Sequence, residues 1–123
     1  MSAALQPSLG RRIGNSWRRR GKQPGTVDVT PEKVIATEKR RATEIRWNDI
    51  TRIDCGTLDT ISIDIFFVVL QTASAKITID EFADGFRVFE SAVFERWPQL
   101  REHWVAIQCG PLHQPQYVTL WQR

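Results

Sequence analysis

The sequence has few of the side chains on which catalysis and metal binding depend. Its 123 residues include two cysteines and two histidines. Cys55 and Cys109 form no CxxC pair, and neither His103 nor His113 is spaced with them as in a zinc site. No local signature joins a nucleophile, a base and an orienting group. We therefore expect a protein that is not an enzyme, with no catalytic residue, no metal site and no cofactor.

Long hydrophobic runs are also absent. The longest, residues 65–70, is far shorter than the roughly 20 apolar residues that cross a bilayer, and it is too short for a secretory signal. The sequence therefore predicts no transmembrane segment. We expect a cytoplasmic protein with reduced thiols, in which Cys55 and Cys109 are small core residues.

Acidic residues are missing from the start of the chain. Residues 1–25 contain six basic side chains and no acid, whereas residues 26–123 contain 11 basic and 14 acidic ones. The pI near 9.2 therefore describes the N-terminal part. A mildly acidic body argues against a duplex-DNA face on that body. We expect a basic flexible tail over residues 1–25 and a single domain over residues 26–123.

One cluster in the tail has binding character: Trp17, Arg18, Arg19 and Arg20. Such a cluster can hold nucleic acid or an anionic lipid surface through release of counterions and stacking of the indole ring. The favoured alternative is a disordered tail that only adds solubility, or a segment that is not part of the mature protein.

Two features of the body resemble ligand sites only weakly. Asp54, Asp59 and Asp64 repeat at five-residue intervals and could ligate a cation, but this spacing matches no metal loop, so we expect a solvated edge. Gly85 follows Asp84 without companion glycines, so no phosphate cradle is indicated.

Alternation of apolar and polar residues predicts an antiparallel sheet. The charged run Glu38-Lys39-Arg40-Arg41 indicates a hairpin tip, and residues 56–60 are expected to form a loop. The predicted strands cover residues 26–30, 34–37, 43–47, 50–55, 61–71 and 76–80.

After residue 80 the apolar period changes to that of a helix. The apolar positions follow at intervals of three or four residues: Phe82, Phe86, Phe89, Val93 and Trp97. Asp80 is the expected N-cap, Glu81 and Asp84 fall in the first turn, and Pro98 stops the helix. We expect a helix over residues 82–97 that covers one face of the sheet.

The end of the chain is less regular. Residues 100–107 fit either a short helix or a strand, and the helix is favoured because Leu100, Trp104 and Ile107 share one helical face. Residues 117–121 are predicted to form a terminal strand or an extended arm.

Two stretches resemble small bacterial pleckstrin-homology-like (PH-like) domains. Residues 29–34 read Val-Thr-Pro-Glu-Lys-Val, and residues 45–53 contain the segment Trp47-Asn48-Asp49-Ile50. The resemblance covers about residues 26–97. It implies an α+β fold with a bent antiparallel sheet or open barrel of six or seven strands and one main helix. It also implies that Trp47 is a packing residue.

The part of the chain after Trp97 resembles uncharacterised small bacterial proteins, some of which are plausible immunity partners of toxins. The resemblance implies a non-catalytic domain that binds another protein, as an immunity or accessory protein. A free sheet edge could accept a strand from such a partner. The alternative is binding of nucleic acid or an anionic surface through Trp17 and the three arginines that follow it.

Overall fold

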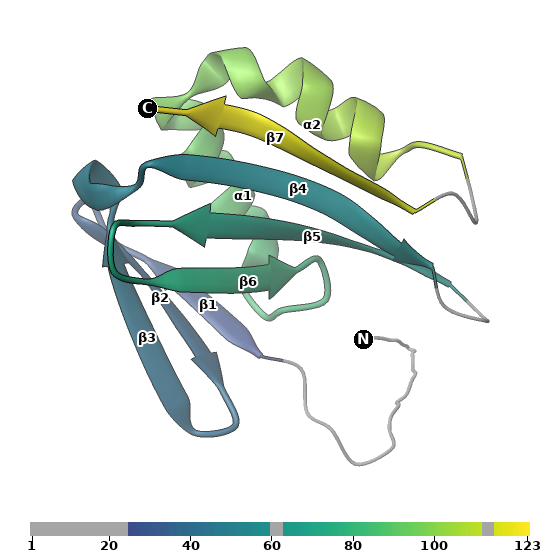
Figure 1. Cartoon of the computed structure of the whole chain (residues 1–123). Helices are drawn as coiled ribbons and strands as arrows, with labels where there is room; N and C mark the ends of the chain where they lie inside the picture. Colours follow the sequence, from purple (N-terminus) through teal and green to yellow (C-terminus); the bar gives the residue numbers. More distant parts are fainter. Residues whose placement is uncertain (1–24, 60–62, 112–114) are drawn as a thin grey trace.

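The computed structural model describes residues 25–59, 63–111 and 115–123 (Figure 1). Over these residues the chain forms seven strands and two α-helices, in the order β1 (Thr26–Val29), β2 (Lys33–Glu38), β3 (Arg41–Arg46), β4 (Arg52–Asp59), β5 (Asp64–Gln71), β6 (Lys76–Asp80), α1 (Phe86–Arg96), α2 (Arg101–Gln108) and β7 (Gln116–Gln122). Short 3-10 turns follow β3 and precede α2. The predicted α+β class is confirmed.

The described strands form two open antiparallel sheets, and neither closes into a barrel. One has the order β1-β2-β3 and the other the order β6-β5-β4-β7. Figure 1 shows α1 and α2 behind the four-stranded sheet, whose near face carries no helix. Among the described residues, α1 is the expected main helix, with 11 residues, and α2 is the shorter helix that was favoured for residues 100–107. Neither described helix has the length and apolar character needed to span a bilayer.

The core lies between the two sheets and the helices. Trp104 of α2 is fully buried against Phe66 of β5 and Phe89 of α1, with ring centroids 5.5 and 6.4 Å away. Trp47 is 3% exposed, and its Nε1 donates a hydrogen bond to the Thr30 carbonyl at 2.9 Å. Trp47 is therefore a packing residue, as predicted.

Helix α1 is shorter than predicted. It spans Phe86–Arg96, whereas the apolar period predicted a helix over residues 82–97. Its buried face is the predicted stripe, because the buried residues are Phe86, Phe89 and Val93. The expected first-turn acids both precede the helix: Glu81 and Asp84.

Local hydrogen bonds explain the late start of α1. The Asp80 carboxylate accepts the N–H of Phe82 at 2.9 Å, and the Asp80 carbonyl accepts the N–H of Ala83 at 3.0 Å. These bonds close a turn. Gly85 then precedes the helix at φ 90°, in the left-handed region that an α-helix cannot contain. The prediction of Asp80 as N-cap was therefore wrong, and Gly85 holds that position.

Strand β4 is longer than predicted, because it runs through the residues expected to form a loop. Gly56 pairs with Phe67 on one side and with Tyr117 on the other. A Cβ at Gly56 would lie 2.4 Å from the Gln116 carbonyl oxygen and 2.9 Å from the Phe67 ring. The glycine is therefore needed for close approach inside the sheet, whereas in sequence it signals a loop.

The C-terminal part forms the favoured helix and, of the two alternatives left open for its end, the strand. Residues 101–108 form a helix, and β7 pairs with β4 across more than 50 residues of sequence. Cys55 is buried, and burial raises the pKa of its thiol to about 12. Cys109 was also predicted to be a core residue. That prediction was wrong, because Cys109 follows the last residue of α2 and is exposed.

Candidate functional site

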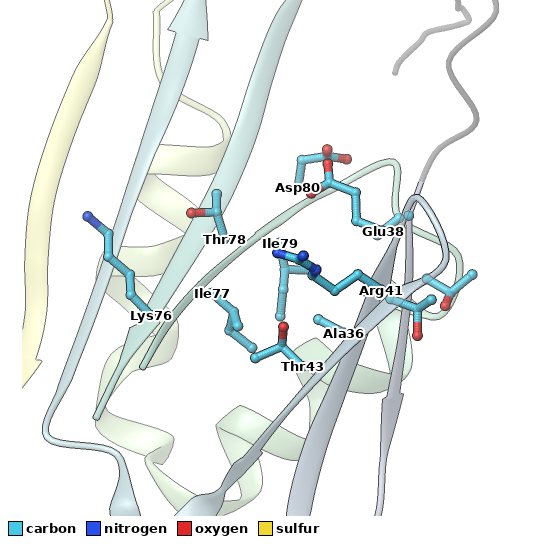
Figure 2. A pocket seen from close by; sticks show the side chains of 13 residues that line it. Ala36, Glu38, Arg41, Thr43, Lys76, Ile77, Thr78, Ile79 and Asp80 are labelled. Carbon is cyan, nitrogen blue, oxygen red and sulfur yellow. The ribbon is translucent and has the colours of Figure 1, made fainter. Parts of the chain in front are cut away.

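A groove separates β6 from the β2–β3 hairpin (Figure 2). Its cavity has a volume of about 260 Å³. The lining includes every residue of β6 together with residues from both strands of the hairpin and from the start of β1. The groove therefore lies where the open edge of the four-stranded sheet faces the inner surface of the three-stranded one.

The hairpin sequence explains why the groove is open. Alternate residues of β2 and β3 face inward, and they lie opposite one another in three pairs. From the core outward, the pairs are Val34 with Ile45, Ala36 with Thr43, and Glu38 with Arg41. The first pair is buried in the core, whereas Glu38 and Arg41 are exposed. Large apolar side chains thus give way to small and then charged ones, so nothing in the hairpin fills the space beside β6.

Strand β6 forms the apolar floor and one wall of the groove. Ile77 and Ile79 are 6% and 3% exposed and point inward, while Lys76 and Thr78 between them are exposed. This is the alternation that predicted the strand, and it is confirmed over Lys76–Asp80.

The hydrogen bonds at the two ends of β6 show which of its backbone N–H and C=O groups point toward β5 and which point away from it. The Glu81 N–H donates to the Phe66 carbonyl at 2.9 Å, and the Thr72 N–H donates to the Ala75 carbonyl at 2.8 Å. Both bonds follow the register of the β5–β6 pair. In an antiparallel pair, positions that bond across the strands alternate with positions whose N–H and C=O point away.

Thr78 therefore presents its backbone to the groove. Counting from the two end bonds, Ile77 and Ile79 bond to β5, whereas the N–H and C=O of Lys76 and Thr78 point away from it. No backbone group in the described ranges pairs with Thr78 on this side. β6 is thus an unpaired sheet edge next to a cavity, a geometry that templates pairing with another strand.

Charged side chains of both signs border the groove. Lys76 and Arg41 carry positive charge, and Glu38 and Asp80 carry negative charge. None of the four belongs to an ion pair among the residues described. Burial raises the pKa of Asp80, and the neighbouring Glu38 acts in the same direction. A positively charged group placed here would be attracted to both carboxylates.

Asp54 lies in a separate cluster on the outer face of the four-stranded sheet, and the prediction that it lies on a solvated edge was wrong. It is fully buried, although Asp59 is exposed. The Arg52 Nε donates to its two oxygens at 2.9 and 3.1 Å, and the Tyr117 hydroxyl donates at 2.7 Å. Within the described part of the chain, no three His, Cys, Asp or Glu residues are placed to hold a metal ion.

These contacts make the contribution of Asp54 to the stability of the folded state depend on pH. Burial alone raises the pKa of Asp54, but hydrogen bonds from Arg52, Tyr117 and Thr119 outweigh it and lower the pKa. A carboxyl whose pKa is lower in the folded state stabilises that state above its ordinary pKa. This stabilisation is lost as the pH falls through the folded value.

We predict that Asp54→Asn lowers the free energy of unfolding at pH 7 by about 1–2 kcal/mol, since the hydrogen bonds weaken and Arg52 is partly exposed. Urea unfolding of both proteins between pH 2 and pH 7 measures the effect. The difference between them should shrink below about pH 4, as the pH falls from the ordinary pKa of an aspartate toward the lower pKa of folded Asp54. A difference that is constant across this range would contradict the assignment.

The outer face of the four-stranded sheet also carries exposed apolar side chains. Tyr117 and Leu58 are 54% and 55% exposed, and the Tyr117 ring lies 6.1 Å from that of Phe67. These residues lie on β4, β5 and β7, and β4 and β5 are paired on both sides. β7 is the other edge of this sheet, but unlike β6 it contributes no residue to the groove, so the groove is the stronger candidate.

The site that sequence reasoning singled out lies elsewhere in the chain. Trp17, Arg18, Arg19 and Arg20 fall outside the described residues, as does His113. His103 is exposed on α2. The sequence contained a signal for β6, its clean alternation, but no signal that β6 would be an edge.

Comparison with known proteins gives no further guide. No protein-family model matches the chain, and no curated protein and no solved structure matches it either.

Proposed function

We propose that this protein is a non-catalytic binding domain whose groove accepts an extended segment of a partner protein. The segment adds to the four-stranded sheet as a strand beside β6. The observation that carries the proposal is the backbone of Thr78, which faces a cavity of about 260 Å³ without a described backbone partner. Strand addition to such an edge is a general mode of peptide recognition.

The groove also contains the features that give such binding selectivity. Alternate side chains of an added strand would point inward, over the small Ala36 and the buried Ile77 and Ile79. The Glu38 and Asp80 carboxylates lie at one end of β6, and Lys76 lies at the other. A partner strand with small apolar residues and a basic residue near Asp80 fits this pattern.

A PH-like fold and a role as an immunity or accessory protein are part of the same proposal. The order of strands followed by a helix, together with the packing of Trp47, supports the PH-like assignment. β7 lies outside the resemblance, which covers about residues 26–97. It follows two helices and adds to the sheet by pairing with β4. A protein that binds a toxin needs a recognition surface and no catalytic group, as proposed for the groove.

The test compares Thr78→Pro with Thr78→Ala. Proline removes the outward N–H and places its ring in the groove, but an edge position tolerates it because no bond to β5 is lost. Linear peptides are selected on the wild-type protein from a random 12-residue library, and their affinities are measured by fluorescence anisotropy. We expect Thr78→Pro to weaken binding at least tenfold, because the lost backbone bond and the steric block each act against it.

Thr78→Ala is the matched control, since it keeps the backbone N–H, and its affinity should stay within about threefold of wild type. Circular dichroism of both variants checks the fold. Peptides that bind Thr78→Pro as tightly as wild type, or a selection that yields no linear peptide, would refute strand addition at β6.

The alternative function is binding of nucleic acid or an anionic surface through Trp17, Arg18, Arg19 and Arg20. These residues lie outside the described ranges, and no observation in the groove favours this function. It stays a prediction from the sequence.

A further inference from the structure

β6 carries charges of opposite sign at its two ends, and these charges select the direction of a strand that pairs with it. Lys76 begins the strand and Asp80 ends it. We propose that the groove takes a segment that runs antiparallel to β6 and reads, from its N-terminus, basic, small apolar, polar, small apolar, acidic. This inference rests on the proposed function, because it names the class of segment that the same groove binds.

The backbone of β6 fixes the register of the segment. By the alternation described above, the N–H groups of Lys76, Thr78 and Asp80 point away from β5. In an antiparallel pair, such a position exchanges two hydrogen bonds with the residue directly opposite, so a segment centred on Thr78 pairs with all of β6. Parallel pairing is slightly less stable per residue, and the described strands of both sheets pair antiparallel.

The two apolar residues of the segment follow from the inner face of β6. Ile77 and Ile79 are buried and point inward, so the residues opposite them place their side chains on the same face. Ala36 and Thr43 of the hairpin line the groove on its other side (Figure 2). The cavity between them and β6 has a volume of about 260 Å³, so it suits small side chains such as those of valine or alanine.

The two ends of the segment follow from charge. Residues directly opposite in an antiparallel pair have neighbouring Cβ atoms, so a basic residue opposite Asp80 and an acidic residue opposite Lys76 are both attracted. Glu38 lies at the same end as Asp80 and strengthens the preference for a basic residue there. Arg41 is the register partner of Glu38, but the described part of the chain contains no ion pair between them. A segment with its charges reversed meets like charge at both ends.

Two peptides of identical composition test this direction. They are Gly-Lys-Val-Thr-Val-Asp-Gly and its reverse, Gly-Asp-Val-Thr-Val-Lys-Gly, both acetylated and amidated so that they carry no terminal charge. Each competes for the full chain with a fluorescent peptide from the random library, and anisotropy measures the displacement. We expect the first to bind at least fivefold more tightly, because the reverse can satisfy both charges only by parallel pairing. Equal binding, tighter binding of the reverse, or no displacement by either peptide would overturn the inference.

A charge reversal in the protein tests the pairing at Lys76. Lys76→Glu alters an exposed side chain of β6, and Arg101→Glu makes the same change in net charge on α2, away from the groove. A third peptide, Gly-Lys-Val-Thr-Val-Lys-Gly, is compared with the first. In Lys76→Glu the ratio of the two affinities should shift at least fivefold toward the third peptide, and in Arg101→Glu less than twofold. An unchanged ratio in Lys76→Glu, or an equal shift in both variants, would contradict the pairing.

These outcomes differ from failure of the proposed function. If Thr78→Pro weakens binding of the library peptides while wild type does not distinguish the first peptide from its reverse, the groove binds strands without this pattern, and only the inference fails. If the library yields no linear peptide, the proposed function fails, and the inference fails with it.

Discussion

Trp104→Ala is expected to lower the free energy of unfolding by about 4 kcal/mol, a large part of the roughly 5–15 kcal/mol that stabilises a domain of this size. The Trp104 side chain has no exposed surface. Its ring lies between 5.0 and 6.4 Å from four phenylalanine rings, those of Phe66, Phe86, Phe89 and Phe94. Removing it opens a cavity that these neighbours, three on α1 and one on β5, cannot fill.

A hydrogen bond adds to this cost. The Trp104 Nε1 donates to the Glu90 carboxylate at 2.7 Å, and Gln108 donates to the same oxygen at 3.3 Å. Trp104→Phe retains a ring but removes the donor, so we expect an intermediate loss of about 2 kcal/mol. Equilibrium urea unfolding measures both variants.

Val105→Ala is the neighbouring control, because Val105 is 40% exposed on the same helix. Its effect should stay within about 0.5 kcal/mol. A loss below about 1.5 kcal/mol for Trp104→Ala would show that the helices repack freely and that Trp104 does not organise the core.

Gly85→Ala is expected to cost about 3 kcal/mol or more, because the backbone conformation and the space at this position both exclude a side chain. Gly85 has a φ of 90°, and a Cβ there would lie 2.2 Å from the Val27 carbonyl oxygen. That oxygen belongs to β1, which pairs with β2 and cannot move alone. The clash would push the segment before α1 away from β1.

Gly110→Ala provides the comparison for this prediction. A Cβ at Gly110 would first meet the flexible Gln116 side chain, at 3.0 Å, so a loss below about 1 kcal/mol is expected. Thermal unfolding followed by circular dichroism should place the midpoint of Gly85→Ala at least about 10 °C below that of Gly110→Ala. Similar midpoints would contradict the argument.

The Gly85 prediction also concerns the groove. The Val27 N–H donates to the Asp84 carbonyl at 2.8 Å, and the Asp84 N–H donates to the Gly25 carbonyl. These bonds hold the start of β1, which lines the groove, against the segment before α1. A Gly85→Ala protein that remains folded should therefore bind the selected peptides more weakly than the Gly110→Ala protein.

Sequence reasoning succeeded where local period alone decides the structure. The alternation over residues 76–80 predicted β6, and the charged run from Glu38 to Arg41 predicted the hairpin between β2 and β3. The helical stripe located α1, and Trp47 packs as the resemblance implied. In each case the pattern repeats within one element, so its buried face can be read without knowing the partner element.

Prediction from the sequence failed where a strand far away in the chain decides the environment of a glycine or an acidic residue. Gly56 indicated a loop but lies inside a sheet, because Tyr117, 61 positions later, passes directly beside it. Asp54 indicated a solvated edge but is buried under Arg52 and the same tyrosine. Gly85 lay within the first turn of the predicted helix, but the helix begins only after it. Its backbone is left-handed and packs against Val27 of β1, where no side chain fits.

The sequence by itself determined that the chain forms a half-buried strand at residues 76–80, since side-chain alternation requires only local contacts. Only the tertiary structure decided that this strand is a sheet edge beside a cavity. Strand order depends on pairings between residues far apart in the chain, such as β4 with β7, which leave β6 with a single neighbour. The unpaired backbone at Thr78 follows from that order, and no local pattern encodes it.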